Sequence, residues 1–200
     1  MTRRNCIRYL VLFEALALRD ISTAVKKRFP TLRHVVDSGL MTEGELAIVD
    51  GLKSDHPKFW IPIQWCCTLV AKARDEGRLE SDQLFEQLMR TIMKFRLSVA
   101  TLLCYDWISI PLVYTQVVNL GVRTYFVVAL LGRQYLDPSK GFLNSETDYY
   151  IPVFTMLQFI FYVGWLKVAE VLMNPMGEDD EDFETNYVID RNLQAFAFSF

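Results

Sequence analysis

The chain has 200 residues, of which 52% are hydrophobic and 14% aromatic, and this composition excludes a disordered or low-complexity protein. Its 21 basic and 24 acidic side chains give a net charge of −3, and six of the acids lie between positions 178 and 184. Residues 1–100 carry 16 basic and 12 acidic side chains, a small surplus that is spread along helical faces. The charge pattern therefore gives no support for nucleic-acid binding.

The first hundred residues have the hydrophobic period of helices. Apolar residues from Asn5 to Phe29 recur close to every 3.6 positions, and Pro30 is expected to end this helix. A second helix is expected from Ser81 to Cys104, with Ser81 and the following aspartate as its cap. Turn-forming residues between these helices indicate shorter pieces. We therefore expect a helical bundle over residues 1–106.

Two apolar segments in the second half predict membrane helices. The segment Trp107–Gly132 has 26 residues and a single charge, Arg123, and Ile151–Leu166 has 16 residues and none. The second continues to position 173 if Lys167 and Glu170, which stand three residues apart and can pair, are tolerated. About 20 mostly apolar residues suffice for a helix to cross a bilayer, so both segments qualify.

The alternative for both segments is a pair of buried helices in a large soluble domain. Aromatic residues near the ends of the segments favour the membrane, because such rings gather at the interface. The basic surplus precedes the first segment, so residues 1–106 and 175–200 are expected in the cytosol, with an extracellular connection near 133–150. The predicted fold is all-α: a cytosolic helical bundle continuous with a transmembrane hairpin of two helices within 107–174.

The sequence offers little material for catalysis. The four cysteines, Cys6, Cys66, Cys67 and Cys104, have no C-x-x-C spacing and lie in apolar stretches, so buried reduced thiols are expected rather than disulfides or a zinc site. There are only two histidines. Neither a nucleophile–base pair nor a glycine-rich phosphate loop is evident, so an enzyme is not predicted.

The acidic run directly follows the second apolar helix. We expect Pro175 to stop that helix, which leaves the carbonyls of residues 171–174 without intrahelical donors beside six carboxylates. Ca²⁺ accepts backbone carbonyls and carboxylates together, so this junction is a candidate calcium site. It does not fit an EF-hand, because Gly177 precedes the acids. The alternative is a solvated acidic turn that favours the N-terminus of a helix starting at Asp182.

Several long stretches resemble the bestrophin family. They are 106–118, from Asp106 to Val118; Gly132-Arg133-Gln134; 152–155; Gln158-Phe159; 161–170, from Phe161 to Glu170; and Asn174-Pro175-x-Gly177-Glu178-Asp179-Asp180. Shorter matches lie at Ser22–Val25, Lys27–Pro30, 39–42 and Phe59-Trp60-x-Pro62, so the similarity covers nearly the whole chain.

The resemblance implies a subunit of a calcium-activated chloride channel in the plasma membrane. Bestrophins are pentamers in which a ring of subunits surrounds one pore, so a homo-oligomer or hetero-oligomer in a lipid bilayer is implied. The acidic run would be the family's calcium clasp, with Cl⁻ as the transported ion. Gln83 would lie at the cytosolic pore constriction, where a polar side chain makes dewetting less effective. The implied calcium ligands are the backbone oxygens of Val171 and Asn174 and the carboxylates of Asp179 and Asp182, with Asp180 close by.

One departure from the family concerns the start of the chain. Bestrophins begin with two further hydrophobic helices, one of which lines the pore neck, and the chain starts after the position expected for them. We therefore expect an N- and C-terminally truncated, partial bestrophin. The alternative function is a truncated, non-conducting subunit that assembles with full-length channel subunits and modulates them.

Overall fold

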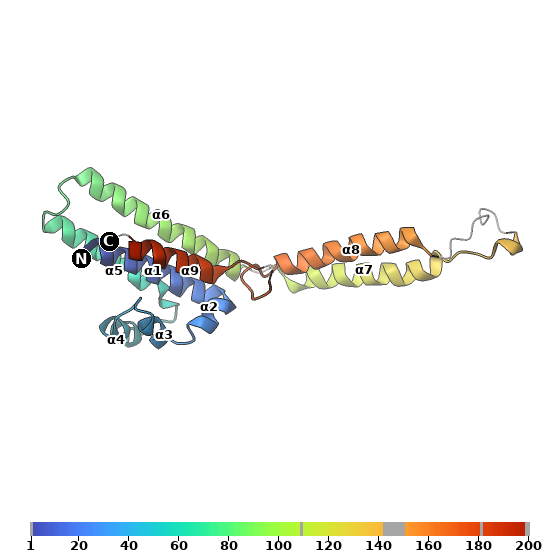
Figure 1. Ribbon diagram of the computed structural model, residues 1–200, viewed down its shortest axis with the longest axis horizontal. Helices are drawn as coiled ribbons and strands as arrows, with labels where there is room; N and C mark the ends of the chain where they lie inside the picture. The colour runs from blue at the N-terminus through green and yellow to red at the C-terminus, as the bar shows by residue number, and fades with distance from the viewer. Residues whose placement is uncertain (1, 109, 142–150, 181, 199–200) are drawn as a thin grey trace. The chain divides into compact units, whose positions relative to one another are not determined.

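The computed structural model describes residues 2–108, 110–141, 151–180 and 182–198, and its elements are helices throughout this part of the chain. The chain divides into two compact units (Figure 1). Unit 1 comprises residues 1–109 and 176–200, and unit 2 comprises residues 110–175. The all-α prediction is confirmed, and the second unit is an insertion within the sequence of the first.

Unit 1 is organised around helix α1 (Thr2–Ile21), which packs on α5 (Ile61–Asp75), α6 (Asp82–Trp107) and α9 (Thr185–Phe198) (Figure 1). Its middle, from Val11 to Leu18, is almost entirely buried. Leu12 and Leu16 belong to one apolar cluster, whereas Phe13 and Ala17 belong to another. Helix α1 is therefore the shared wall of two adjoining cores.

The helix expected from Asn5 to Phe29 is interrupted at Ser22. There the backbone leaves the helical region (φ −107°, ψ 124°), and a second helix, α2 (Thr23–Arg28), follows. The Ser22 side chain is buried, and its hydroxyl lies 2.9 Å from that of Thr185 at the start of α9. A buried hydroxyl needs a partner, so the break places Ser22 where a distant helix can supply one.

Two short helices, α3 (Leu32–Asp37) and α4 (Glu43–Gly51), pack against one another beside α1. Helix α4 begins with a capping box: Thr42 Oγ1 accepts from the Glu45 N–H, and Glu45 accepts from the Thr42 N–H at 2.8 Å. A 3-10 turn (Lys58–Trp60) then leads into α5. These elements close the apolar cluster around Leu12.

Helix α6 begins where the sequence predicts. Ser81 is its N-cap and accepts a hydrogen bond from the Leu84 N–H at 3.4 Å. The helix continues to Trp107, beyond the expected end at Cys104. Its inward residues, including Ile92 and Val99, contact the cluster around Phe13, while most of its other side chains are exposed.

Unit 2 contains two long helices, α7 (Leu112–Gly132) and α8 (Val153–Leu172), and a 3-10 turn (Pro138–Lys140) (Figure 1). The first apolar segment was expected to start at Trp107, but α7 starts at Leu112 after Pro111. Proline disfavours a helical residue before it, so it separates α7 from α6. Phe126 of α7 stacks edge-to-face on Phe159 of α8, with centroids 5.1 Å apart. The two helices thus pair through aromatic side chains.

Both helices of unit 2 are long and apolar enough to cross a membrane. Within this chain α8 has no buried residue, and Phe126 and Ala129 are the buried residues of α7. Within this chain the helices do not show the burial expected of core helices in a soluble domain. Their exposed apolar surface fits a lipid environment, so the helical membrane protein is confirmed.

All four cysteines are free thiols, but only Cys66 and Cys67 are buried; Cys6 is half-buried and Cys104 is exposed. The Cys66 thiol donates to the Cys6 carbonyl oxygen at 3.8 Å. Its hydrogen bond with the Cys6 side chain and its burial together raise the pKa of Cys66. The expectation of buried thiols therefore holds for α5 and fails for Cys104, which is exposed although its neighbour Leu103 packs against the cluster around Phe13.

Candidate functional site

The acidic segment of unit 1 forms a turn that two of the expected calcium ligands close. The Asp179 N–H donates to Asp182 Oδ2 at 2.8 Å, and the Asp182 N–H donates to the Asp179 carbonyl at 2.9 Å. Asp179 and Asp180 are exposed, and Asp182 is half-buried. The turn holds the Asp182 carboxylate by its own backbone and leaves exposed carboxylates beside it.

Ion pairs tie this segment and the following helix to α2. Lys27 pairs with Glu178, and Arg28 Nη2 lies 2.6 Å from Asp190 Oδ1. Thr185, which makes the buried contact with Ser22, lies between Glu178 and Asp190 in sequence. Helix α9 begins at Thr185, three residues after the start at Asp182 that the alternative of a solvated acidic turn assumed, and Asp182 is instead hydrogen-bonded to Asp179. Contacts from residues 22–28 therefore set the position of the acidic segment within unit 1.

The other two expected calcium ligands lie at the end of α8 in unit 2. The helix ends at Leu172, and the Asn174 N–H donates to the Val171 carbonyl at 3.3 Å. The Val171 carbonyl was expected to lack an intrahelical donor, and its donor Asn174 lies beyond the end of the helix. The N–H of the capping residue Met173 is also directed at the Val171 carbonyl.

The donor types at these positions suit calcium. Carboxylate and carbonyl oxygens are the ligands that Ca²⁺ takes, six to eight at a time in flexible geometry. Among the described residues, no three His, Cys, Asp or Glu side chains converge as a metal-binding group. The predicted calcium site has only two side-chain ligands, Asp179 and Asp182, and takes its other ligands from backbone oxygens. It stays a prediction.

Gln83 lies in the first turn of α6, two residues after the Ser81 cap, and its side chain is exposed. The neighbouring Asp82 pairs with Arg74, which fixes the start of α6 to the end of α5. The role of Gln83 at a pore constriction stays a prediction. The Gln83 side chain is exposed, so its amide makes no contact with the core of this chain.

A polar network joins α7 to α8 within unit 2. Glu170 receives hydrogen bonds from Lys167 Nζ at 2.7 Å and from Asn119 Nδ2 at 3.2 Å, and Arg123 Nε donates to Asn119 Oδ1 at 2.6 Å. The pairing of Lys167 with Glu170 is therefore confirmed. Arg123 also has a partner inside the hairpin, so each charge of these membrane helices is accounted for by a neighbour.

Asn119, Lys27 and Ser22 are polar residues that the sequence analysis did not single out. Asn119 links two charged residues across the hairpin, and the signal available was its place as an isolated amide in an apolar segment. Lys27 and Ser22 act through residues more than 150 positions away, which no local pattern indicates.

The fold and these features define a helical membrane protein with a cation-suited acidic segment. Residues 1–198 match the family described as "Bestrophin, RFP-TM, chloride channel". The chain therefore belongs to the bestrophin family, which is a family of channels rather than enzymes. This confirms the resemblance seen in the sequence.

Individual relatives agree with this assignment. The chain is 53% identical to human (Homo sapiens) bestrophin-3 over 195 residues, which cover 98% of the chain and 29% of that protein. It is 52% identical to mouse (Mus musculus) bestrophin-2 over 193 residues, 96% of the chain and 38% of that protein. A crystal structure of a bacterial bestrophin homologue from Klebsiella pneumoniae aligns with a TM-score of 0.74 at 18% identity, over 98% of this chain and 66% of the bacterial one, and shows the same fold. The chain thus spans about a third of the length of these curated relatives.

Proposed function

We propose that this chain is part of a subunit of a calcium-activated chloride channel, in which several subunits, five by analogy with the family, form one pore. The family match and the pair of membrane helices support an anion channel. The acidic segment supports regulation by calcium. Its location is proposed to be the plasma membrane, with residues 1–106 and 175–200 in the cytosol and the connection near 133–150 outside.

The observation that carries the calcium proposal is the turn at 179–182. Asp182 Oδ2 caps the Asp179 N–H, so the carboxylate has a fixed position before any ion arrives. We propose that Asp179, Asp180 and Asp182 act with the carbonyl oxygens of Val171 and Asn174. Calcium would supply the positive charge that offsets these carboxylates. A preorganised carboxylate binds a cation with less loss of conformational freedom.

Contacts within unit 1 suggest how the acidic segment acts on the pore. The segment continues into α9, which packs on α1, and α1 contacts α6. Gln83 lies at the start of α6 and is proposed to face the cytosolic constriction. When calcium orders the segment, the position of α9 would change, and its contacts would pass this change through α1 to α6. Binding of one ion would thus alter the conformation of the whole unit.

Chloride flux from liposomes tests this proposal. The chain is reconstituted, and free Ca²⁺ is stepped from nanomolar to micromolar concentrations. We expect flux to rise with calcium, and we expect Asp179→Asn and Asp182→Asn to shift the response to higher calcium. Asp137→Asn is the matched control, because Asp137 is an exposed aspartate outside the acidic segment, and its calcium response should not change.

Two results contradict the proposal. An unchanged calcium response in both segment variants would refute the ligand assignment. Absence of flux at every calcium concentration, from correctly inserted protein, would refute conduction by this chain alone. In that case, loss of conductance when the chain is co-reconstituted with a complete bestrophin would support the non-conducting, modulating subunit instead.

A further inference from the structure

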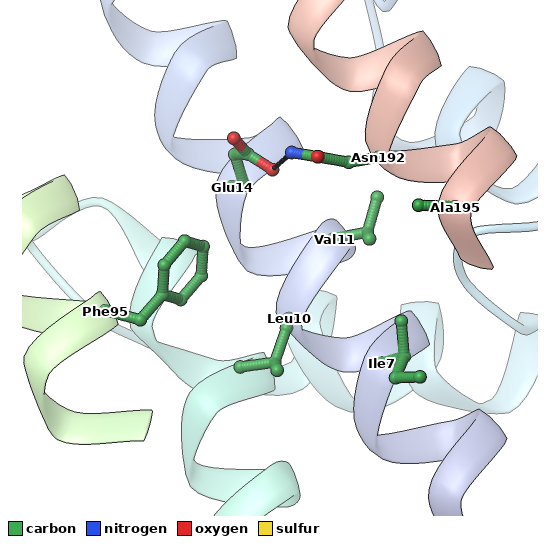
Figure 2. A pocket seen from close by; sticks show the side chains of 7 residues that line it. All are labelled: Ile7, Leu10, Val11, Glu14, Phe95, Asn192 and Ala195. Carbon is green, nitrogen blue, oxygen red and sulfur yellow. Dashed lines mark hydrogen bonds between the residues drawn. The ribbon is translucent and has the colours of Figure 1, made fainter. Parts of the chain in front are cut away.

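A pocket in unit 1 opens between helices α1, α6 and α9 (Figure 2). Its volume is about 270 Å³. None of its lining residues belongs to the acidic segment 178–184. Its walls are the apolar side chains of Ile7, Leu10, Val11 and Phe95, together with the polar groups of Glu14 and Asn192.

The polar side of the pocket is a hydrogen-bonded acid and amide. Asn192 Nδ2 donates to Glu14 Oε2 at 2.7 Å, the dashed line in Figure 2. Glu14 is half-buried, and burial raises its pKa although the bond from Asn192 acts in the opposite direction. Among the ion pairs formed by the described residues, none involves Glu14.

A half-buried carboxylate to which the described residues offer no cation is unusual in an apolar pocket. Removing the charge from water is costly unless an opposite charge or several donors compensate it, and here one amide N–H does so. The carboxylate keeps acceptor capacity, because an ionised carboxyl has about four lone-pair sites and the Asn192 bond uses one. The pocket thus combines an unmatched negative charge with an apolar wall.

We propose that this pocket binds a small organic ammonium ion, whose N–H groups donate to Glu14 and whose short apolar tail lies against Leu10, Val11 and Phe95. At about 30 Å³ for each water of liquid, the pocket has the volume of about nine waters, which limits the ligand to a molecule of similar size. An anion would be repelled by Glu14, so the site is distinct from chloride transport. The ligand would touch both α1 and α9.

The binding of benzylammonium to the chain in lipid nanodiscs tests the proposal. Benzylammonium joins one cation to one small apolar ring, and benzyl alcohol is the neutral match. Calorimetry, with empty nanodiscs subtracted, gives affinities, and the side-chain amide signal of Asn192 in nitrogen-15 NMR reports the place of binding. We expect saturable binding of the ammonium, a shift of the Asn192 signal, and weaker binding of the alcohol.

Variants separate the pocket from other sites. Glu14→Gln keeps a hydrogen-bonding side chain without the charge and should weaken binding by at least about tenfold. Ala195→Phe narrows the pocket without removing the carboxylate, and should also weaken binding. Asp20→Asn, an acid of the same helix outside the pocket, is the matched control and should bind as before.

Three results would overturn the proposal. These are equal affinities for the ammonium and the alcohol, unchanged affinity in both pocket variants, or binding that leaves the Asn192 signal in place. Equal affinities would indicate an apolar site in which Glu14 keeps its proton. The readouts are binding alone, so they do not depend on calcium or on conduction.

Discussion

Replacing Glu45 by glutamine should remove a large part of the stability of unit 1. Glu45 accepts two hydrogen bonds from Arg8, at 2.7 and 2.8 Å, and one from Tyr9 at 2.9 Å, and only 13% of its side chain is exposed. Burial by itself would raise the pKa of Glu45, but bonds from Arg8, from the Thr42 N–H and from Tyr9 lower it from the usual 4.5 to about 2. The ionised form is therefore the one that the fold stabilises.

The size of the effect follows from the shift. A difference of about 2.5 pKa units at 1.36 kcal/mol each corresponds to about 3 kcal/mol. Because the pKa of Glu45 is depressed in the folded state, this contribution is complete above pH 4.5 and is lost as the pH falls from 4.5 toward 2. In Glu45→Gln the loss is present at neutral pH, and Arg8 also keeps a partly buried charge without its carboxylate.

Unfolding in mild detergent at a series of pH values measures both effects. We expect Glu45→Gln to be less stable by about 3 kcal/mol at pH 7 and to lose less further stability between pH 5 and 3 than the parent protein. Glu43→Gln is the matched control, since its pair with Arg33 is more than 60% exposed and should contribute under about 1 kcal/mol. Equal stability of the parent and Glu45→Gln at pH 7, or the same acid dependence in both, would refute the reasoning.

Two further predictions concern the acidic segment and the membrane hairpin. Lys27→Ala removes the partner of Glu178, so the acidic segment becomes more negative and should bind calcium more readily. The calcium concentration that half-activates chloride flux should fall about twofold, whereas the control Lys26→Ala should not change it. An unchanged or higher half-activating calcium concentration in Lys27→Ala would contradict the prediction. Glu170→Gln leaves the Asn119 amide with a weaker acceptor, so thermal unfolding in detergent should show a loss of about 1 kcal/mol, and a variant as stable as the parent would show that the network does not hold the helices.

Local sequence patterns predicted the helix ends that depend only on neighbouring residues. Ser81 was predicted to cap α6 and does so, because a cap depends only on the next few residues. The length and apolar composition of two segments likewise predicted the two membrane helices. The start of α7 was missed by five residues, since an apolar composition continues through Ile108 and Ile110 while the backbone changes at Pro111.

Distant contacts account for what the sequence did not indicate. The break at Ser22 is coupled to Thr185 across 163 positions, and nothing near Ser22 interrupts the hydrophobic period. Asp182 accepts a hydrogen bond from the Asp179 N–H and does not start a helix, so α9 begins only at Thr185. The sequence indicated the acidic segment itself. Its ion pairs with α2 could not be predicted, because they depend on which helices pack together.

The insertion of unit 2 within unit 1 has a consequence for biosynthesis. Helix α9 places Ile189, fully buried, in the same core as Leu12, yet 66 residues of unit 2 are made between the two parts of unit 1. At about 5 to 20 residues per second, the ribosome needs roughly 3 to 13 s to make unit 2. During that interval the apolar face of α1 that later packs on α9 stays uncovered, while the hairpin enters the bilayer. Chaperone protection of that face is therefore expected to matter most after membrane insertion begins and before translation reaches α9.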